Sequence, residues 1–176
     1  MSRRQSISIR NRQRVRRINL RRLREVVLLC MRESLFVESF ELGIQIVDAK
    51  EMTKLNEQYL QHRGSTDVIT FDYLEPEGPG RQSRSPRLCP EVGEEGDVAK
   101  PIHGDIFLCM DEANRQAREF NSSWQEEIVR YIIHGVLHLL GHDDRTAARR
   151  AKMKRDEDLV MRSLDRMVLR RWLNEK

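Results

Sequence analysis

Residues 124–144 read WQEEIVRYIIHGVLHLLGHDD and form the most apolar run of the 176-residue chain. Ser122 or Ser123 can cap a helix at the start of this run, because Glu126 is placed to complete a capping box. The apolar side chains then recur three or four positions apart, which is typical of a helix: Ile128, Ile132, Val136 and Leu139 or Leu140. Gly141 permits the left-handed backbone that often ends a helix. The segment therefore predicts a buried core helix.

The chain on either side of this helix contains further strand and helix patterns. Alternating apolar residues, or runs of β-branched and aromatic residues, predict four strands at 6–9, 40–46, 67–71 and 105–109. Asn19 and Asp48 can cap helices that follow the first two strands. Residues 111–120 are a further helical pattern, and Thr146 can cap a last helix that begins at Ala147. With the core helix, the patterns predict four strands and five helices.

The length of the chain suits one domain, because two domains would each be near the lower size limit for an independent core. All five prolines and four of the nine glycines lie between Leu74 and Pro101. A segment of this composition cannot hold a packed core. We therefore expect a single domain over 1–176 with a long, exposed and mobile insertion at about 74–101.

The sequence carries no sign of a membrane span or of export. No run of about 18 uncharged apolar residues occurs. The three cysteines, Cys30, Cys89 and Cys109, are odd in number and form no CxxC pair, which favours a reducing compartment. The start of the chain, MSRRQSISIR, lacks the apolar stretch of a secretory signal; its Arg and Ser content permits a transit peptide, but strand and helix patterns begin almost at once. We expect a cytoplasmic protein.

Positive charge is concentrated at the N-terminus. The formal net charge is +4, but residues 1–24 contain ten arginines and no acid, so that the remainder carries 22 basic and 28 acidic residues. Guanidinium groups match the geometry of phosphate, which makes nucleic acid the natural partner of this block. The alternative is an ordinary solvated helix face with a disordered tip, because a charge block is by itself a weak signal.

Two histidines near the end of the core helix point to a metal ion. His134 and His138 are four residues apart and so project from one face of the helix, and Gly141 lets the acids that follow return toward them. A buried histidine is often only a satisfied core residue, but two imidazoles on so apolar a helix are costly to bury without a shared cation. Position 135 is Gly, whereas zinc proteases of the HExxH type have their general base there, which argues against proteolysis.

Three segments together resemble the YbeY family of endoribonucleases, the rRNA maturation factors. HGVLHLLGHDD at 134–144 is similar to the family signature HGxLHLxGxDH. Asn56, Tyr59 and the segment STDVITF at 65–71 are similar to the family's N...YR.....TDVLSF, and GDIFL at 104–108 is similar to its GDIxI strand. In order and spacing, the resemblance covers residues 6–164.

The resemblance implies an α+β fold, a mixed sheet packed by helices, with one zinc ion held by three residues of the signature in a positively charged cleft. The matching metal ligands are His134 and His138, and the third position falls on Asp144, where the commonest pattern has His. We favour Asp144, since a carboxylate is a sound zinc ligand, over recruitment of His142. The family's arginine after the tyrosine falls on a leucine here; Arg63, three residues on, is the candidate catalytic replacement, with a solvated loop residue as the alternative.

The function that the resemblance implies is zinc-dependent, single-strand-specific endoribonuclease activity in rRNA maturation, including 16S rRNA 3′ end processing, and in ribosome quality control. Its expected partners are single-stranded rRNA and the small ribosomal subunit. The alternative is a non-catalytic ribosome-assembly or RNA-binding factor with a structural zinc, for which Asp144 and His142 would both bind the metal and close the site. A hydrolase of another phosphoester or of an amide is a third possibility, and the oligomeric state is left open.

Overall fold

The computed structural model describes residues 4–74, 100–164, 168, 169 and 172. The insertion expected at about 74–101 lies almost entirely outside these residues. Among the described residues, no helix combines the length and the apolarity that crossing a bilayer requires.

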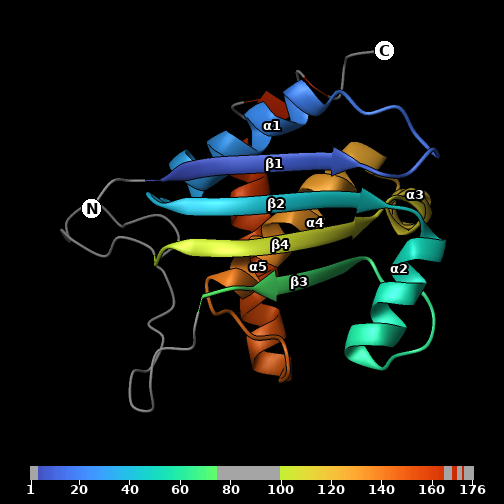
Figure 1. The fold of residues 1–176 in the computed structure, drawn as a ribbon. Helices are drawn as coiled ribbons and strands as arrows, with labels where there is room; N and C mark the ends of the chain where they lie inside the picture. Colours follow the sequence, from blue (N-terminus) through green and yellow to red (C-terminus); the bar gives the residue numbers. More distant parts are fainter. Residues whose placement is uncertain (1–3, 75–99, 165–167, 170–171, 173–176) are drawn as a thin grey trace.

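All four expected strands are present and form one mixed sheet (Figure 1). Its order is β1-β2-β4-β3, in which β1, β2 and β4 are parallel and β3 runs antiparallel to β4. The strands are β1 (Gln5–Asn11), β2 (Phe40–Val47), β3 (Val68–Asp72) and β4 (Ile102–Cys109). β4 begins earlier than its local sequence predicts, because Ile102 pairs in register with Phe40 at the start of β2. Tertiary pairing thus extends the strand beyond its own alternation pattern.

Among the residues that the structure describes, five α-helices accompany the sheet, as expected from their periodicity. They are α1 (Leu20–Leu29), α2 (Ala49–Leu55), α3 (Met110–Glu119), α4 (Trp124–Leu139) and α5 (Ala147–Leu164). The Asn19 side chain accepts a hydrogen bond from the Arg22 amide, and the Asp48 side chain accepts one from the Glu51 amide. Ser123, rather than Ser122, caps α4 and forms the capping box with Glu126. The predicted cap at Asn19, the one at Asp48 and the capping box are therefore confirmed.

Helices α1 and α2 each end in a π-helical turn, which the sequence pattern does not predict. α1 leads into the π-helical turn η1 (Cys30–Ser34), and α2 leads into the π-helical turn η2 (Asn56–Leu60). The second turn includes Tyr59, although the spacing of Met52, Leu55 and Tyr59 along the sequence also fits an ordinary α-helix. A one-residue widening of the hydrogen-bond ladder leaves no signature in side-chain spacing, so the sequence pattern does not distinguish the two.

Helix α4 lies at the centre of the core. Figure 1 shows α1, α4 and α5 covering one face of the sheet, with α2 and α3 at the end where β2 and β4 finish. The α4 residues that were predicted to be apolar and buried are all buried in the structure: Ile128, Ile132, Val136, Leu139 and Leu140. The inward side chains of β2 pack in the same cluster. This packing fixes the position and rotation of α4, and with them the direction of its histidines.

Gly135 explains how closely α4 approaches the sheet. A Cβ atom at this position would lie 2.9 Å from the Ile106 side chain of β4 and 3.0 Å from the Thr70 methyl group of β3. Overpacking of this kind costs about 1–3 kcal/mol. The position at which zinc proteases have a glutamate is therefore a packing contact with the sheet in this protein.

Candidate metal centre

His134 and His138 lie on the last turns of α4 with their rings facing each other. The two Nε2 atoms are 3.0 Å apart, and the ring planes are nearly perpendicular, at 78°. Two imidazole nitrogens bound to one tetrahedral zinc ion at 2.0–2.1 Å are roughly 3.3 Å apart. The spacing of the pair therefore fits a shared cation.

The other nitrogen of each ring is held by an acceptor. His138 Nδ1 lies 3.1 Å from the backbone oxygen of His142, and His134 Nδ1 lies 2.5 Å from a carboxylate oxygen of Glu157. A carbonyl and a carboxylate accept hydrogen bonds, so each ring carries a proton on Nδ1 and a lone pair on Nε2. Two lone pairs that face each other require a cation or a proton between them. The donor set thus fits a metal ion.

Asp144 completes the cluster. One ligand atom from each of His134, His138 and Asp144 lies within 4.8 Å of the others. The chain reaches this position because Gly141 has φ of 94°, as predicted, and ends α4 with two hydrogen bonds. The Gly141 amide donates to the His138 carbonyl oxygen, and the His142 amide donates to the Leu137 carbonyl oxygen. The turn at Gly141 therefore reverses the chain, and in the folded protein Asp144 lies beside the two imidazoles.

His142, the alternative third ligand, points elsewhere. Its side chain is only 3% exposed, and its Nδ1 atom lies 3.4 Å from Asp156 on α5. Its Nε2 atom finds no hydrogen-bond partner among the residues that the structure describes. Burial, together with the charge of Lys152, lowers the pKa of His142. The structure places Asp144, and not His142, beside the pair.

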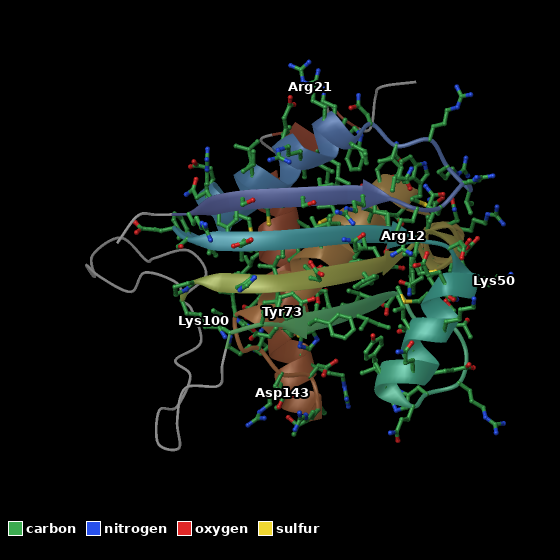
Figure 2. The ribbon with its side chains drawn as sticks, viewed as in Figure 1. Arg12, Arg21, Lys50, Tyr73, Lys100 and Asp143 are labelled. Carbon is green, nitrogen blue, oxygen red and sulfur yellow. The ribbon has the colours of Figure 1, made fainter. Side chains whose placement is uncertain are left out.

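The neighbouring Asp143 faces outward. It accepts a hydrogen bond from the Arg145 amide and forms an ion pair with Arg149. These contacts, the Arg145 amide foremost, lower the pKa of Asp143. Figure 2 shows Asp143 at the end of the molecule where α5 begins. Asp143 therefore braces the loop that carries Asp144.

The electrostatic surroundings of the two imidazoles differ. Burial opposes the charged form of His134, but the hydrogen bond and charge of Glu157, assisted by Asp67 and Asp144, raise its pKa overall. Burial and the neighbouring His134 lower the pKa of His138. His138 is therefore the ring that more readily stays neutral, which is the form that binds metal.

A cavity of about 560 Å³ opens beside the cluster, between α3, α4 and α5. Its lining includes His134. Three cationic side chains also line it, Arg130, Arg150 and Lys154, together with four carboxylates, Glu127, Asp144, Glu157 and Asp158. Arg130 forms an ion pair with Asp158 at 3.0 Å, and Arg150 donates to the Asp144 backbone oxygen at 2.9 Å. The described lining is thus of mixed charge, unlike the positively charged cleft that was expected. A bound divalent cation would turn its balance positive.

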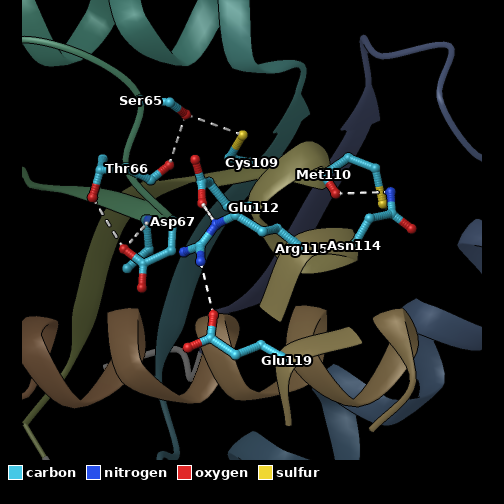
Figure 3. Close-up of polar contacts among 10 residues, drawn as sticks. Ser65, Thr66, Asp67, Cys109, Met110, Glu112, Asn114, Arg115 and Glu119 are labelled. Carbon is cyan, nitrogen blue, oxygen red and sulfur yellow. Dashed lines mark hydrogen bonds and ion pairs between the residues drawn. The ribbon is translucent and has the colours of Figure 1, made fainter. Parts of the chain in front are cut away.

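Arg63 lies outside this lining. It is exposed in the loop 61–67, which connects η2 to β3. The loop is fastened by Asn56, whose side-chain amide donates to the Gly64 carbonyl oxygen at 2.8 Å, and by the backbone of Asp67, which accepts from the Cys109 amide. Figure 3 shows the Ser65 hydroxyl against Cys109 and the Thr66 hydroxyl against Asp67. Arg63 is thus an exposed residue of a fastened loop, and it is not among the residues that line the cavity.

Glu157 was missed by sequence reasoning. It sits in an Arg-Asp-Glu-Asp run at 155–158 that reads as the solvated face of a charged helix. The spacing of Glu157 could have indicated its burial. The apolar residues Met153 and Val160 of α5 lie four residues before it and three residues after it. Residues at such spacings share one helix face, and that face packs against α4.

The arginine-rich N-terminal residues lie on β1, at the edge of the sheet opposite β3, on α1, and in the loop between them, which contacts α2 and α3. Figure 2 shows Arg12 and Arg21 far from Asp143. Several members of the block have protein partners: Arg12 forms an ion pair with Glu51 at 2.7 Å, and Arg16 donates to the Asn114 side chain at 3.0 Å. α3 lies between the arginine-rich residues and the metal cluster. Its residue Asn114 contacts Arg16, and its residue Gln116 lines the cavity beside the cluster.

Comparison with known proteins points to one family. A family model described as Endoribonuclease YbeY matches residues 7–165. A protein named Endoribonuclease YbeY from Thermoanaerobacter pseudethanolicus is 33% identical over 162 residues, which cover 91% of this chain and 98% of that protein. A protein of the same name from Salinibacter ruber is 32% identical over 123 residues, which cover 70% of this chain and 69% of that protein.

A solved structure supports the fold alone. The solution structure of a Thermotoga maritima protein matches with a TM-score of 0.51 at 21% sequence identity, covering 93% of this chain and 95% of that one.

Proposed function

We propose that this chain, which belongs to the Endoribonuclease YbeY family, is a metal-dependent endoribonuclease that hydrolyses phosphodiester bonds of single-stranded RNA. The observation that carries the proposal is the pair of Nε2 atoms 3.0 Å apart, with Asp144 beside them. Zinc is the proposed metal, since two imidazoles and a carboxylate are among its usual ligands in catalytic sites. Three protein ligands are one fewer than zinc usually takes, so a bound ion would remain open to water or substrate.

When bound, the ion supplies a Lewis acid that polarises a phosphoryl oxygen or brings the pKa of bound water to about 7. The chain contributes the rest of the mechanism. His134 and His138 present lone pairs to one point because their Nδ1 protons are held elsewhere. The adjoining cavity admits the substrate strand, and Arg130, Arg150 and Lys154 on its wall contact backbone phosphates.

Arg63 is the candidate catalytic guanidinium in this proposal. It stands on the loop 61–67, and Asp67 at the end of that loop is close enough to His134 to raise its pKa. From this loop an exposed guanidinium stabilises negative charge on the phosphoryl group in the transition state.

We extend the proposal to the biological substrate that the family resemblance implies. The chain acts in the cytoplasm on rRNA bound to the small ribosomal subunit, in 16S rRNA 3′ end processing and in ribosome quality control. Contacts to phosphate position a strand but do not read its sequence. The choice of cleavage site then comes from the ribosome rather than from this chain.

The alternative of a non-catalytic assembly or RNA-binding factor with a structural zinc needs a fourth protein ligand. His142 is the residue available for it, yet it faces Asp156 instead of the cluster. This contact favours an open metal position over a closed one.

The deciding experiment combines elemental analysis of the purified protein with an RNA cleavage assay. We expect about one zinc ion per chain, cleavage of single-stranded RNA but not of a duplex, and loss of cleavage after treatment with a chelator. Restoring zinc should restore cleavage. Cleavage that continues in metal-free protein would contradict the proposal, and a metal-loaded protein that leaves RNA intact would favour the structural alternative.

A further inference from the structure

We infer that Glu157 is a positioning residue, which holds the His134 imidazole in the orientation and tautomer that metal binding needs. The inference rests on the proposed ligand set of His134, His138 and Asp144, but it does not depend on the reaction that the metal supports. Glu157 lies on α5, 23 residues beyond His134, and contacts it across the interface between α4 and α5.

The burial of Glu157 is the first argument. The buried residues of α5 form one stripe, and Glu157 is the charged member of it: Met153, Glu157, Val160, Met161 and Leu164. Glu157 is 8% exposed. A buried carboxylate is costly unless it is paired, and an apolar residue would suit this stripe better. Glu157 therefore occupies a place that packing alone does not explain.

The contact of Glu157 is the second argument. Its Oε1 atom lies 2.5 Å from His134 Nδ1, on the far side of the ring from Nε2. An acceptor at this position keeps the proton on Nδ1, leaves the Nε2 lone pair for the metal, and stops the ring from rotating. Its charge also makes the imidazole a more basic ligand.

The neighbours of Glu157 provide the contrast. Asp158 forms an ion pair with Arg130, and Asp156 lies against Lys152 and His142. His138 Nδ1 is held by a backbone oxygen, which no substitution of a side chain removes. Among the described residues, Glu157 is therefore the one side chain whose replacement frees an imidazole of the proposed centre.

The test measures metal affinity in the full-length protein. Glu157→Gln retains a hydrogen-bond acceptor but loses the charge, and Glu157→Leu loses both while suiting the apolar stripe. Asp158→Asn is the matched control, since it changes charge by the same amount on the same helix without touching a proposed ligand. The zinc dissociation constant is obtained by competition with a chromophoric chelator. The absorption spectrum of the cobalt-loaded protein reports ligand geometry.

Outer hydrogen-bond partners of metal ligands are worth about 10- to 100-fold in affinity. We expect Glu157→Leu to weaken zinc binding by about that factor, Glu157→Gln to lie between it and the wild type, and Asp158→Asn to stay near the wild type. The cobalt spectrum should change in Glu157→Leu alone. The metal-free Glu157→Leu protein should unfold at a temperature no lower than the wild type, because an apolar side chain replaces a buried carboxylate.

Equal zinc affinity in the wild type and in Glu157→Leu would overturn the inference. So would a fall in the unfolding temperature of the metal-free Glu157→Leu protein without any change in affinity, because that result indicates a purely structural role. If the graded affinity loss is found in a protein that does not cleave RNA, the positioning role stands and the proposed function fails. If the wild type binds neither zinc nor cobalt, both the positioning role of Glu157 and the proposed function fail.

Discussion

The sequence marks two regions for function, the metal cluster at the end of α4 and the arginine-rich residues 1–24, and they are built differently. The arginine loop is the part of the second region at residues 12–18. In the cluster, each imidazole is held at Nδ1 and faces its partner at Nε2. In the arginine loop, one buried residue organises the backbone: Gln13 is 5% exposed, donates to the Arg16 carbonyl oxygen and accepts from the Val15 and Arg16 amides. The arginine side chains themselves are exposed.

The difference follows from the work that each region is proposed to do. A metal ion needs ligand atoms in fixed positions, and holding polar groups in place requires burial and hydrogen bonds. Phosphate attraction depends on charge and tolerates mobile side chains. Among the described residues, Arg14 and Arg17 enter no ion pair, which suits a surface that binds by charge. Substitutions should therefore act sharply in the first region and gradually in the second.

The largest effect is expected from His138→Ala. Removing one imidazole leaves two of the three proposed ligands, and the metal contributes several kcal/mol to catalysis. We expect the purified variant to contain no stoichiometric zinc and its RNA cleavage rate to fall on the order of a thousandfold or more. The fold should persist, as measured by circular dichroism. A variant that retains its metal would show that the two-histidine arrangement is not the binding site.

A comparison of Asp144→Ala with His142→Ala sharpens the first region. Asp144 lies within the cluster, and His142 is turned toward Asp156. We expect Asp144→Ala to release the metal and abolish cleavage, and His142→Ala to keep the metal. Zinc content and chelator competition measure both. If His142→Ala releases the metal and Asp144→Ala keeps it, His142 is the third ligand. If both variants lose the metal, both residues bind it and the site is closed and structural.

A smaller effect is expected from neutralising Arg14, Arg16 and Arg17 together. For single-stranded nucleic acid, each lost phosphate contact reduces the slope of log affinity against log salt by about 0.7. Three lost contacts should therefore flatten the slope by about 2, with zinc content unchanged. The control neutralises Arg32, Lys54 and Arg162, which are exposed and lie outside residues 1–24. An unchanged slope in the first variant would assign RNA binding to another surface and remove the contrast between the two regions.

Much of the fold was predictable because local spacing reports local geometry. Asn19, Asp48 and Ser123 begin helices where their side chains cap free amides, and Gly141 ends α4 in the left-handed conformation. The four strands were predictable in the same way, and the mixed sheet that they form was what the family resemblance implied. The early start of β4 was not predictable, because it depends on pairing with a distant strand. The π-helical turns η1 and η2 were not either, because a one-residue widening of the hydrogen-bond ladder leaves no signature in side-chain spacing.

The sequence by itself determined that His134 and His138 share one helix face and that a turn at Gly141 follows them, because both depend on backbone geometry within a few residues. Only the tertiary structure decided that Asp144 rather than His142 meets the pair, and that Glu157 supports His134 from another helix. Those choices depend on the angle and depth at which α5 packs against α4. Contacts between segments far apart in the chain are set by the packing of the whole core, which the local spacing of residues does not encode.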